Sequence, residues 1–570
     1  MITKEIESIG KISYVEDFSE KTFKFRHEKF SKLITKDTVV LDIGAHTGWF
    51  SLLFGSCAKK VLSFEPNPFV FNSLKQNSEN NSQLNIVPHK LACTQENKKY
   101  VFNYSDPNVY GIGSNGGFLD NLSDKKFKNA HTYQQEVDGV NVLDFLNKNY
   151  INDIPNINFI KIDAEGYDKE IIKTIKPLIE NNKPILMVEA FKFLTELELE
   201  DYFNTINSLG YDIYDISPLD NITDCVGPLD IDEFKYFTYN ICDNGNFLCV
   251  HKDQVNKYNL PTKVKGKTSV IIFGRNDGYK EKERFCIHLK TLLETFDEII
   301  YIDWNSDNIS FLYEVKDILP KTGRIKHLVI PPAAVQELIN YNKDAQECNS
   351  SLAFNIGLRR TDAEYVIFAT TDILCPLKSV WDNFIKSTNK YSFYTLSRRE
   401  VDYDDVIKHK DNLNEYREQL DKTSKPRYFP AKVTPNDNYS IFNCPGDFQF
   451  ATKNIWYKLR GYEEDMLYSC FADTNVQKKS VLYGFNLVPI YDVPLYHMSH
   501  KNYLPQGGST KNLHEVSKNR KPTVYNDVLT WVEYFDKYDK HEHIMISRNE
   551  DTWGFSYIRS EEHTSELQSH

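Results

Sequence analysis

The feature that most constrains the fold is an apolar run at residues 39–43 that is followed directly by a glycine-bearing turn. A second apolar run at residues 61–64 ends in Glu65. Glycine lets the backbone approach a ligand, and an acid at the end of the second strand accepts hydrogen bonds from ribose hydroxyls, so this pattern predicts a nucleotide-type cofactor site in an α/β sheet. An ordinary strand, turn and helix would explain Gly44, but it would not explain an acid, Glu65, about twenty residues further along the chain.

The spacing of the glycines indicates which cofactor is held. Dinucleotide folds usually carry three glycines around a pyrophosphate, whereas here Gly44 and Gly48 are four positions apart with His46 between them. S-adenosylmethionine has no phosphate, so this turn favours a methyl donor over NAD.

Composition excludes several classes of protein. The 570-residue chain is 41% hydrophobic and has a net charge of -12 without a long Lys/Arg block, so we expect sizeable cores and no nucleic-acid partner. It has no run of eighteen apolar residues and no leader-like start, which predicts a cytoplasmic protein without stable membrane insertion. None of the ten cysteines has C-x-x-C spacing, so neither a zinc site nor a redox dithiol is indicated.

The first half of the chain alternates strand and helix signals, which predicts a doubly wound α/β sheet. Asn67 and Pro68 form a good N-cap and first position for one of the helices. Two further runs, at residues 211–216 and 247–251, are expected to complete the sheet as an antiparallel edge pair. The predicted parallel strands are residues 39–43, 61–64, 84–87, 158–162 and 185–189.

A stretch at residues 94–135 interrupts this alternation. Its glycine-rich run at residues 111–117 predicts a flexible loop, either a lid over an acceptor or a plain surface insertion.

Residues 1–253 are expected to form the first domain, residues 254–267 a polar linker, and residues 268–545 a second α/β domain. In the second domain, strands are predicted at residues 269–273, 298–302 and 364–368, and helices at residues 280–294 and 350–359. Residues 546–570 form a tail whose last eleven residues resemble non-native adapter-derived sequence.

Four blocks of residues stand in a fixed order in the first half of the chain. They are Asp42-Ile-Gly44-Ala-His46-Thr-Gly48-Trp-Phe50, Phe64-Glu65-Pro66-Asn67, Ile160-Lys161-Ile162-Asp163-Ala164-Glu165-Gly166-Tyr167, and Met187-Val188-Glu189. With these blocks in the family's order, residues 35–190 resemble the FkbM family of S-adenosylmethionine-dependent methyltransferases. The resemblance implies a class I methyltransferase (Rossmann-like) fold and methyl transfer, usually to a hydroxyl oxygen and often on a sugar.

The resemblance and the chemistry of the cofactor imply roles for these residues. Gly44 is expected against the methionine part, Asp42 near its amino group, Glu65 on the ribose and Cys93 near the adenine, while His46 shapes the turn. The expected cofactor-binding set is Asp42, Gly44, His46, Gly48, Glu65, Asn67, Cys93 and Asp163.

An alcohol acceptor benefits from a general base, and Asp163 and Glu165, at the end of the fourth strand, are the candidates. With Glu189 they form an alternative set of ligands for a divalent cation. Asp163 as a loop-capping acid and Glu189 as a buried, hydrogen-bonded acid are the simpler interpretations.

A second set of blocks lies between residues 268 and 500. They are Ser269-Val-Ile-Ile-Phe-Gly-Arg275-Asn276-Asp277, Asp303-Trp-Asn305-Ser306, Ala353-Phe-Asn355-Ile-Gly357-Leu-Arg359, Gly446-Asp447-Phe448-Gln449, and Arg460-Gly461-Tyr462-Glu463-Glu464. Through these blocks, residues 268–500 resemble, less closely, nucleotide-sugar glycosyltransferases of the GT-A type. Where that family has its D-x-D motif, this chain has Thr370-Thr-Asp372.

This second resemblance implies a diphosphate leaving group neutralised by Mn²⁺ or Mg²⁺. Asp372 with His497 or His500 would hold the ion, and Asp473 or Glu464 would be the base. The expected nucleotide-sugar-binding residues are Arg275, Asn276, Asp303, Asn355 and Arg359. Alternatively, Asp372 caps the next helix and the domain only binds glycan.

The sequence therefore predicts a bifunctional enzyme of glycan assembly that uses a sugar or glycan acceptor and a nucleotide-sugar donor. The alternatives are a methyltransferase of a small molecule or lipid with an inert second half, and a non-catalytic glycan-binding scaffold. Nucleic-acid methylation is disfavoured by the acidic net charge.

Overall fold

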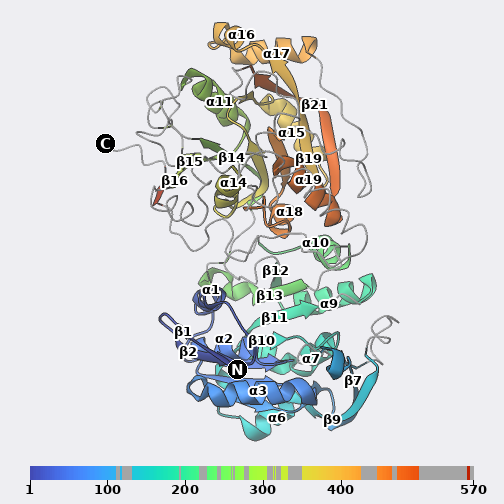
Figure 1. The fold of residues 1–570 in the computed structure, drawn as a ribbon. Helices are drawn as coiled ribbons and strands as arrows, with labels where there is room; N and C mark the ends of the chain where they lie inside the picture. The colour runs from blue at the N-terminus through green and yellow to red at the C-terminus, as the bar shows by residue number, and fades with distance from the viewer. Residues whose placement is uncertain are drawn as a thin grey trace. The chain divides into compact units, whose positions relative to one another are not determined.

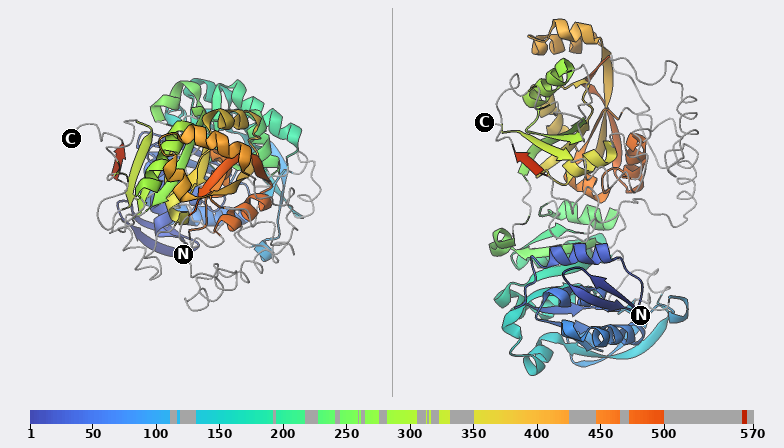
Figure 2. Two further views of the ribbon diagram at one scale, coloured as in Figure 1. Left: turned by 90° about the horizontal axis from the view of Figure 1, so that it is seen from above. Right: turned by 60° about the vertical axis from the view of Figure 1, so that its left-hand side comes forward.

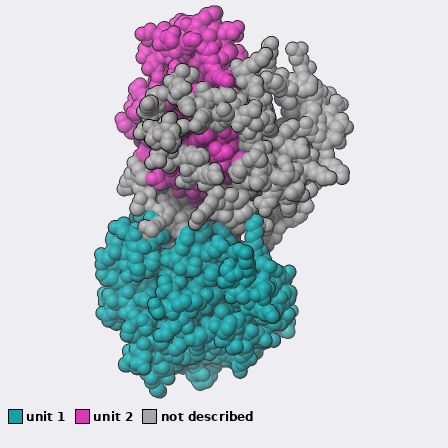
Figure 3. Space-filling model, turned by 90° about the vertical axis from the view of Figure 1, so that its left-hand side faces the viewer, with its two compact units in different colours: residues 1–262 teal, residues 263–570 magenta. Residues whose placement is uncertain are grey.

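The chain folds as two compact units, residues 1–262 and 263–570 (Figure 3). The computed structural model describes residues 1–110, 116–118, 131–191, 194–216, 227–240, 245–258, 260, 264–274, 282–304, 312, 315, 323–330, 350–424, 446–464, 472–499 and 561–564.

The first unit is built on a seven-stranded sheet whose five parallel strands match the predicted ones (Figure 1). The predicted edge pair is also confirmed, because β13 is antiparallel to both of its neighbours. In spatial order the strands are β12 (Tyr211–Asp215), β13 (Gly245–His251), β11 (Ile185–Ala190), β10 (Ile157–Ile162), β3 (Val39–Ile43), β4 (Lys60–Phe64) and β5 (Ile86–His89).

Helices connect these strands, and the predicted cap of α3 is present because the Asn67 side chain accepts a hydrogen bond from the Phe69 N–H. The helices are α1 (Glu20–Phe30), α2 (Trp49–Cys57), α3 (Pro68–Asn80), α4 (Pro107–Tyr110), α6 (Val142–Asn149), α7 (Asp168–Thr174), α8 (Lys176–Asn182), α9 (Glu196–Ser208) and α10 (Ile231–Lys235). Short turns of helix are η1 (Ser82–Leu84), η4 (Ile154–Asn156), η6 (Tyr236–Asn240) and η7 (Lys252–Tyr258).

Two smaller sheets complete the unit. A hairpin of β1 (Ile2–Ile6) and β2 (Gly10–Tyr14) precedes α1. The described part of the insertion that interrupts the alternation forms a four-stranded sheet, whereas residues 111–115 and 119–130 lie outside the described residues. Its strands in spatial order are β6 (Ala92–Thr94), β9 (Tyr133–Asn141), β7 (Lys98–Tyr104) and β8 (Gly116–Gly117).

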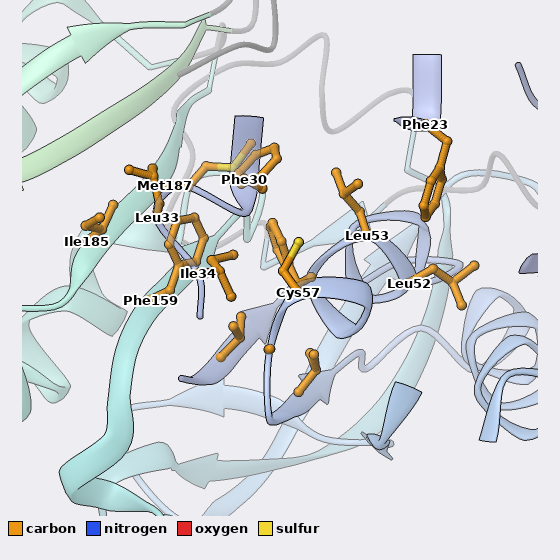
Figure 4. Close-up of a cluster of buried hydrophobic side chains, with 14 of the residues drawn as sticks. Phe23, Phe30, Leu33, Ile34, Leu52, Leu53, Cys57, Phe159, Ile185 and Met187 are labelled. Carbon is orange, nitrogen blue, oxygen red and sulfur yellow. The ribbon is translucent and has the colours of Figure 1, made fainter. Parts of the chain in front are cut away.

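A cluster of buried apolar side chains joins α1 and α2 to the central sheet (Figure 4). The ring of Phe30 meets the ring of Phe54 edge-on at 5.2 Å and that of Phe159 at 6.0 Å between centroids. Burying a side chain of this size stabilises the fold by about 1.5–3 kcal/mol, so the three rings fix α1 and α2 on one face of the sheet.

The order of the strands places a topological switch point between β3 and β10. From β3 the chain runs outward to β4 and β5, and it later returns to the other side of β3 as β10 and then β11. Connections on opposite sides leave a crevice at the carboxyl ends of these two strands, which is where α/β sheets bind ligands.

The second unit contains a nine-stranded mixed sheet, and its long parallel pair β19 and β21 can be followed in Figures 1 and 2. The three predicted strands are confirmed as parts of β14, β15 and β17. In spatial order the strands are β18 (Ile373–Leu374), β21 (Asn486–Met498), β19 (Ser392–Val401), β20 (Phe448–Thr452), β17 (Ala363–Ala369), β14 (Val264–Gly274), β15 (Glu298–Trp304), β16 (Ile325–Ile330) and β22 (Glu561–Thr564).

The predicted helices at residues 280–294 and 350–359 correspond to α11 and α14. The helices of this unit are α11 (Lys282–Thr295), α14 (Ser350–Leu358), α15 (Lys378–Ser387), α16 (Tyr403–Lys408), α17 (Leu413–Thr423), α18 (Lys453–Lys458) and α19 (Ala472–Leu482). The chain therefore contains two α/β domains.

Two expectations about the ends of the domains differ from the structure. Of the expected linker, residues 254–258 belong to η7 and residues 264–267 to β14. Within the expected tail, residues 546–570, strand β22 pairs antiparallel with β16 at the edge of the sheet. An edge strand presents unpaired backbone groups to any extended segment, so this pairing does not require a specific sequence.

We predict that Gly44→Ala strongly destabilises the first unit. Gly44 has φ +73°, and an added Cβ would lie 1.8 Å from the carbonyl oxygen of Asp163. Gly10→Ala is the matched control, because Gly10 has φ +102° with nothing within 4 Å of an added Cβ. In urea unfolding we expect a loss of about 1–2 kcal/mol for the control, from backbone strain alone, and more than about 3 kcal/mol for Gly44→Ala. Equal losses would show that the close approach costs nothing.

Candidate active site

A cavity of about 360 Å³ opens at the carboxyl ends of β3, β4, β10 and β11, at the switch point. Its volume lies in the range of small-molecule sites. Among the predicted cofactor-binding residues, those that line it are Gly44, His46, Glu65, Asn67, Cys93 and Asp163, and the predicted base Glu165 lines it too. Asp42 and Gly48 are outside its lining.

Glu65 joins two turns at the edge of this cavity. Its two carboxylate oxygens accept hydrogen bonds from the backbone N–H groups of His46, at 2.8 Å, and Asn67, at 2.7 Å. The side chain is 6% exposed, and burial raises its pKa to about 7 despite these donors. Each oxygen keeps a second lone pair for a ligand hydroxyl, so the acid shapes the site and can also bind in it.

The two glycines of the motif are required by the packing of the turn. The backbone of Gly44 lies against the end of β10, and an added Cβ at Gly48 would lie 2.6 Å from the Cδ1 atom of Leu74. Gly48 is also the N-cap of α2, with φ +90°. The backbone of Gly44 therefore lies in close contact with the end of β10, and Gly44 also lines the cavity.

Asp42 lies beneath the cavity. It is fully buried, and its Oδ2 atom accepts a hydrogen bond from the hydroxyl of Ser51 at 2.5 Å. Its other oxygen, Oδ1, lies 3.7 Å from the ammonium group of Lys161. Burial raises the pKa of Asp42, and the nearby ammonium opposes that shift.

Lys161 is a central side chain of the site to which the sequence analysis gave no role. Its ammonium, 5% exposed at the side chain, donates to the Gly44 carbonyl at 3.1 Å and to Asp163 Oδ2 at 3.0 Å. Burial alone would lower its pKa, but Asp163 and Asp42 raise it, so Lys161 is a cation at neutral pH. The sequence contained one sign of this role, namely a lysine between Ile160 and Ile162 in a strand predicted to be buried. Lysine is almost never fully buried unless it is paired with an acid.

Asp163 and Glu189 form a hydrogen-bonded pair of acids beside Lys161. Burial raises the pKa of Asp163, but Lys161 and Glu189 outweigh it and lower that pKa overall. Burial and the neighbouring carboxylates raise the pKa of Glu189 well above its usual value. These opposite shifts favour a proton on Glu189 and the ionised form of Asp163.

Apolar side chains form the opposite wall. Cys93 is buried, which raises its thiol pKa and keeps it neutral. Phe102 and Phe118 come from the interrupting insertion, and the ring of Phe118 meets that of Tyr167 at 5.1 Å. The described part of the insertion therefore adds two aromatic rings to the cavity lining, and aromatic rings suit contact with a heterocyclic base.

In the second unit, the structure brings the predicted residues Asp372 and His497 together. Asp372 follows β17, and its Oδ1 atom accepts a hydrogen bond from Thr370 at 2.6 Å. Its Oδ2 atom lies 3.2 Å from Nε2 of His497, whose Nδ1 lies 2.7 Å from Glu400 Oε2. Burial opposes protonation of His497, but the two carboxylates outweigh it and raise its pKa.

Three further polar residues adjoin this group. Arg398 lies 2.9 Å from Glu400 Oε1 and donates to Asp447 Oδ2 at 2.6 Å. Burial raises the pKa of Asp447 and the adjacent Arg398 opposes the shift. An added Cβ at Gly446 would lie 2.6 Å from Asp473 Oδ2, so the predicted base Asp473 lies beside the Gly446-Asp447 turn. Arg398 and Glu400 were not predicted, because only the register of β19 on β21 reveals their position.

Asn355 has a positioning role in this structure. Its amide bonds both the N–H and the carbonyl of Tyr462, at 2.9 and 2.8 Å, and the carboxylate of Glu464 at 3.0 Å. Asp303, at the end of β15, lies 3.5 Å from His327 Nε2, and Arg359 follows α14. The predicted residues Arg275, Asn276 and His500 lie outside the described residues.

Two features are absent from the described part of the chain. No group of three or more His, Cys, Asp and Glu side chains there is arranged to hold a metal ion. No helix among the described residues combines the length and apolar character needed to span a bilayer.

The switch-point cavity has the position and volume of a small-molecule site in an α/β domain. Residues 42–213 match the family model described as the Methyltransferase FkbM domain. This match spans all of the residues that line the cavity after β3 and β10, and it indicates a methyltransferase. No curated protein matches the chain.

Solved structures are similar to parts of the chain at low identity. A methyltransferase FkbM from Methylobacillus flagellatus is 16% identical over 42% of this chain and 56% of its own, with a TM-score of 0.24. S. aureus TarS 1-349 in complex with UDP is 13% identical over 48% of this chain and 72% of its own, with a TM-score of 0.28. GalNAc-T7 with UDP, GalNAc and Mn²⁺ is 13% identical over 47% and 50%, also with a TM-score of 0.28.

We predict that the affinity for S-adenosylhomocysteine, a stable product form of the donor, rises between pH 6 and pH 8. The pKa of Glu65 is about 7, and the ionised carboxylate accepts stronger hydrogen bonds from the ribose hydroxyls than the protonated acid does, so protonation below that pH weakens binding. Glu65→Ala should lower the affinity at pH 8 by tens to a hundredfold and remove this pH dependence.

Calorimetry measures both effects, with Glu79→Ala, an exposed acid of α3, as the control. Thermal unfolding of the free variant shows whether the turn held by Glu65 is still folded. Unchanged affinity in a folded Glu65→Ala protein would remove the ribose assignment.

Proposed function

We propose that the chain is a bifunctional glycan-modifying enzyme, with an S-adenosylmethionine-dependent O-methyltransferase in the first unit and a nucleotide-sugar-dependent glycosyltransferase in the second. The observation that carries the first half of the proposal is the cavity at the switch point. Acids at the ends of three parallel strands line it, and the matched family domain includes them.

The charges of the cavity fit a cationic donor better than a dinucleotide. Among the described lining residues, the acids Glu65, Asp163 and Glu165 outnumber one ammonium group, that of Lys161, while Glu189 carries the proton of its pair with Asp163. Such a lining attracts a sulfonium and repels a diphosphate. Glu65 would hold the ribose, the wall of Cys93 and Phe102 the adenine, and the backbone at Gly44 the methionine part.

S-adenosylmethionine would supply a methyl group on sulfonium, so that the acceptor oxygen forms a C–O bond as the C–S bond breaks with its electron pair left on sulfur. Asp163 takes the hydroxyl proton, because it is the ionised member of the acid pair. The acceptor oxygen gains positive charge as its new bond forms, so a carboxylate of lowered pKa is a sufficient base. Glu189 donates to Asp163 and, with Lys161, keeps it oriented.

Asp163→Asn should lower kcat for methyl transfer by about 10²- to 10⁴-fold, the usual contribution of a general base. Its affinity for S-adenosylhomocysteine should change much less, since the ribose and adenine contacts remain. Asp153→Asn is the control, because Asp153 is also paired with a lysine, Lys60 at 2.7 Å, but does not line the cavity. Full activity of Asp163→Asn in a methyl-transfer assay would transfer the role of base to Glu165.

For the second unit, the proposal rests on the polar group around Asp372 at the carboxyl end of β17. Three acids from separate segments of the chain belong to this group, namely Asp372, Asp447 and Asp473. Asp372 contacts His497, Arg398 contacts Asp447, and Asp473 lies beside Gly446. A diphosphate leaving group would be neutralised there by a divalent ion on Asp372 together with these cationic side chains. Asp473 or Glu464 would serve as the base.

We predict that the purified protein releases nucleotide from one sugar nucleotide of a panel, and that Asp372→Ala abolishes this release. The assay is run with and without Mn²⁺, and release that depends on both the metal and Asp372 supports an ion held by this residue. Asp382→Ala, an exposed acid of α15 paired with Lys378, is the control. Absence of release with acceptor sugars supplied would favour the alternative, a methyltransferase of a small molecule or lipid whose second unit only binds glycan.

A further inference from the structure

Tyr14 is a lining residue of the first cavity to which no role has been given so far. The first unit contains this cavity and a second one, of about 330 Å³, which adjoins it and shares Tyr167 and Glu189 as lining residues. Among the described residues that line either cavity, Tyr14 is the one that lies outside the matched family domain, residues 42–213. It comes from β2, in the hairpin that precedes α1 (Figure 1). The family match therefore does not account for its presence in the cavity.

Amide side chains of α3 hold this hairpin and the glycine-bearing turn against each other. The Asn81 side chain accepts a hydrogen bond from the Ser13 N–H at 2.8 Å and donates one to the Ser13 carbonyl at 2.7 Å. Asn77 donates to the carbonyl of Thr47 at 2.6 Å. Because the two amides lie four positions apart on one helix, they hold the backbone of Ser13 and that of Thr47 on the same face of α3.

Aromatic packing fixes the ring of Tyr14. Its centroid lies 5.2 Å from that of Trp49, and it meets the ring of Phe18 edge-on at 6.5 Å. Trp49 is in turn met edge-on by Phe23 at 5.4 Å, and Trp49 also lines the cavity. The ring of Tyr14 is therefore held by contacts that do not involve its hydroxyl group.

The hydroxyl of Tyr14 belongs to a pair that keeps one proton for a ligand. Its Oη atom, which is only partly enclosed by protein, lies 2.6 Å from Oγ1 of Thr47, and both residues line the cavity. Burial raises the pKa of the Tyr14 hydroxyl, so it keeps its proton at neutral pH. The two hydroxyls carry two protons, and the hydrogen bond between them uses one. Neither hydroxyl makes a further hydrogen bond to the described residues, so the pair has one O–H donor left over.

The start of α2 places further donors on this side of the cavity. The N-cap of this nine-residue helix is Gly48, which has no side chain to accept from the first N–H groups. The first two helical residues, Trp49 and Phe50, line the cavity. The first N–H groups of a helix have no partner within it and carry a partial positive charge, so together with the hydroxyl pair they suit an anionic group.

The proposed donor has one anionic group, and it has not yet been given a partner. Glu65 is assigned to the ribose, and the cavity acids attract the sulfonium and the amino group. The carboxylate of the methionine part would be repelled by Asp163 and Glu165, so it requires donors that are not acids. Tyr14 and Thr47 are uncharged donors, and Thr47 lies three positions after Gly44, where the methionine part is proposed to bind.

We infer that the hydroxyl pair of Tyr14 and Thr47 binds the carboxylate of the amino-acid part of the methyl donor, with Tyr14 as the donating group. The inference rests on the proposed methyltransferase function of the first unit. The Thr47 hydroxyl donates to Tyr14, and the phenol, which is the more acidic of the two hydroxyls, donates to the carboxylate. Tyr14 thus selects a donor that carries a carboxylate over an adenine nucleoside that lacks one.

The test compares two ligands and one isosteric variant in the full-length protein. Calorimetry measures the affinity for S-adenosylhomocysteine and for its decarboxylated analogue, which keeps the adenine, ribose, thioether and amine. The unmodified protein should bind S-adenosylhomocysteine at least tenfold more tightly than the analogue. Tyr14→Phe should lower the affinity for S-adenosylhomocysteine about ten- to hundredfold, the loss of one hydrogen bond to a charged group, and leave that for the analogue unchanged.

The second ligand and a matched variant separate this role from a structural one. A Tyr14→Phe protein whose cavity is distorted would lose affinity for both ligands, whereas loss of the carboxylate contact affects only one of them. Tyr150→Phe is the control, because the Tyr150 hydroxyl contacts His89 at 3.0 Å and neither residue lines the cavity. This control should leave both affinities unchanged.

Each remaining outcome is decisive. If S-adenosylhomocysteine does not bind to the unmodified protein, the proposed function fails and this inference fails with it. If it binds, but Tyr14→Phe leaves its affinity unchanged or lowers both affinities by the same factor, the assignment of Tyr14 is overturned while the methyltransferase proposal stands. Equal affinity of the unmodified protein for the two ligands also overturns the assignment, and this comparison requires no variant to fold.

Discussion

The architecture of the first unit depends on one buried ammonium group. Lys161 joins the end of β3, through the Gly44 carbonyl, to the end of β10, through Asp163, and its third neighbour is Asp42. An isolated buried charge is very costly, so these partners must remain in place whenever the unit is folded. The same contact with Lys161 lowers the pKa of Asp163, which lines the cavity. The acid that compensates the buried ammonium is therefore also the acid proposed as the base.

Much of this unit could be predicted from local sequence. The strands are apolar runs bounded by turns, the cap at Asn67 is a short-range pattern, and Glu65 directly follows its strand and lines the cavity. Asp42 shows the limit of that reasoning. Side chains alternate along a strand, and this one faces the helix layer and Ser51, so its own position in the sequence does not reveal that it lies beneath the cavity.

Contacts between distant segments could not be predicted from the sequence. The role of Lys161 depends on acids of two different strands, Asp42 and Asp163. In the second unit, Arg398 and Glu400 reach Asp447 and His497 only because β19 lies between β20 and β21. Short motifs identified Asp372 and His497 as candidates, but strand register decided which other side chains surround them.

The wall shared by the two cavities couples whatever occupies them. Tyr167 and Glu189 face both spaces, so a ligand that shifts either side chain on one side changes the shape and charge presented on the other. Thermodynamic linkage makes such coupling reciprocal: if filling the first cavity tightens binding in the second by some factor, filling the second tightens the first by the same factor. Two side chains would then couple the binding of the two ligands without any movement of the sheet.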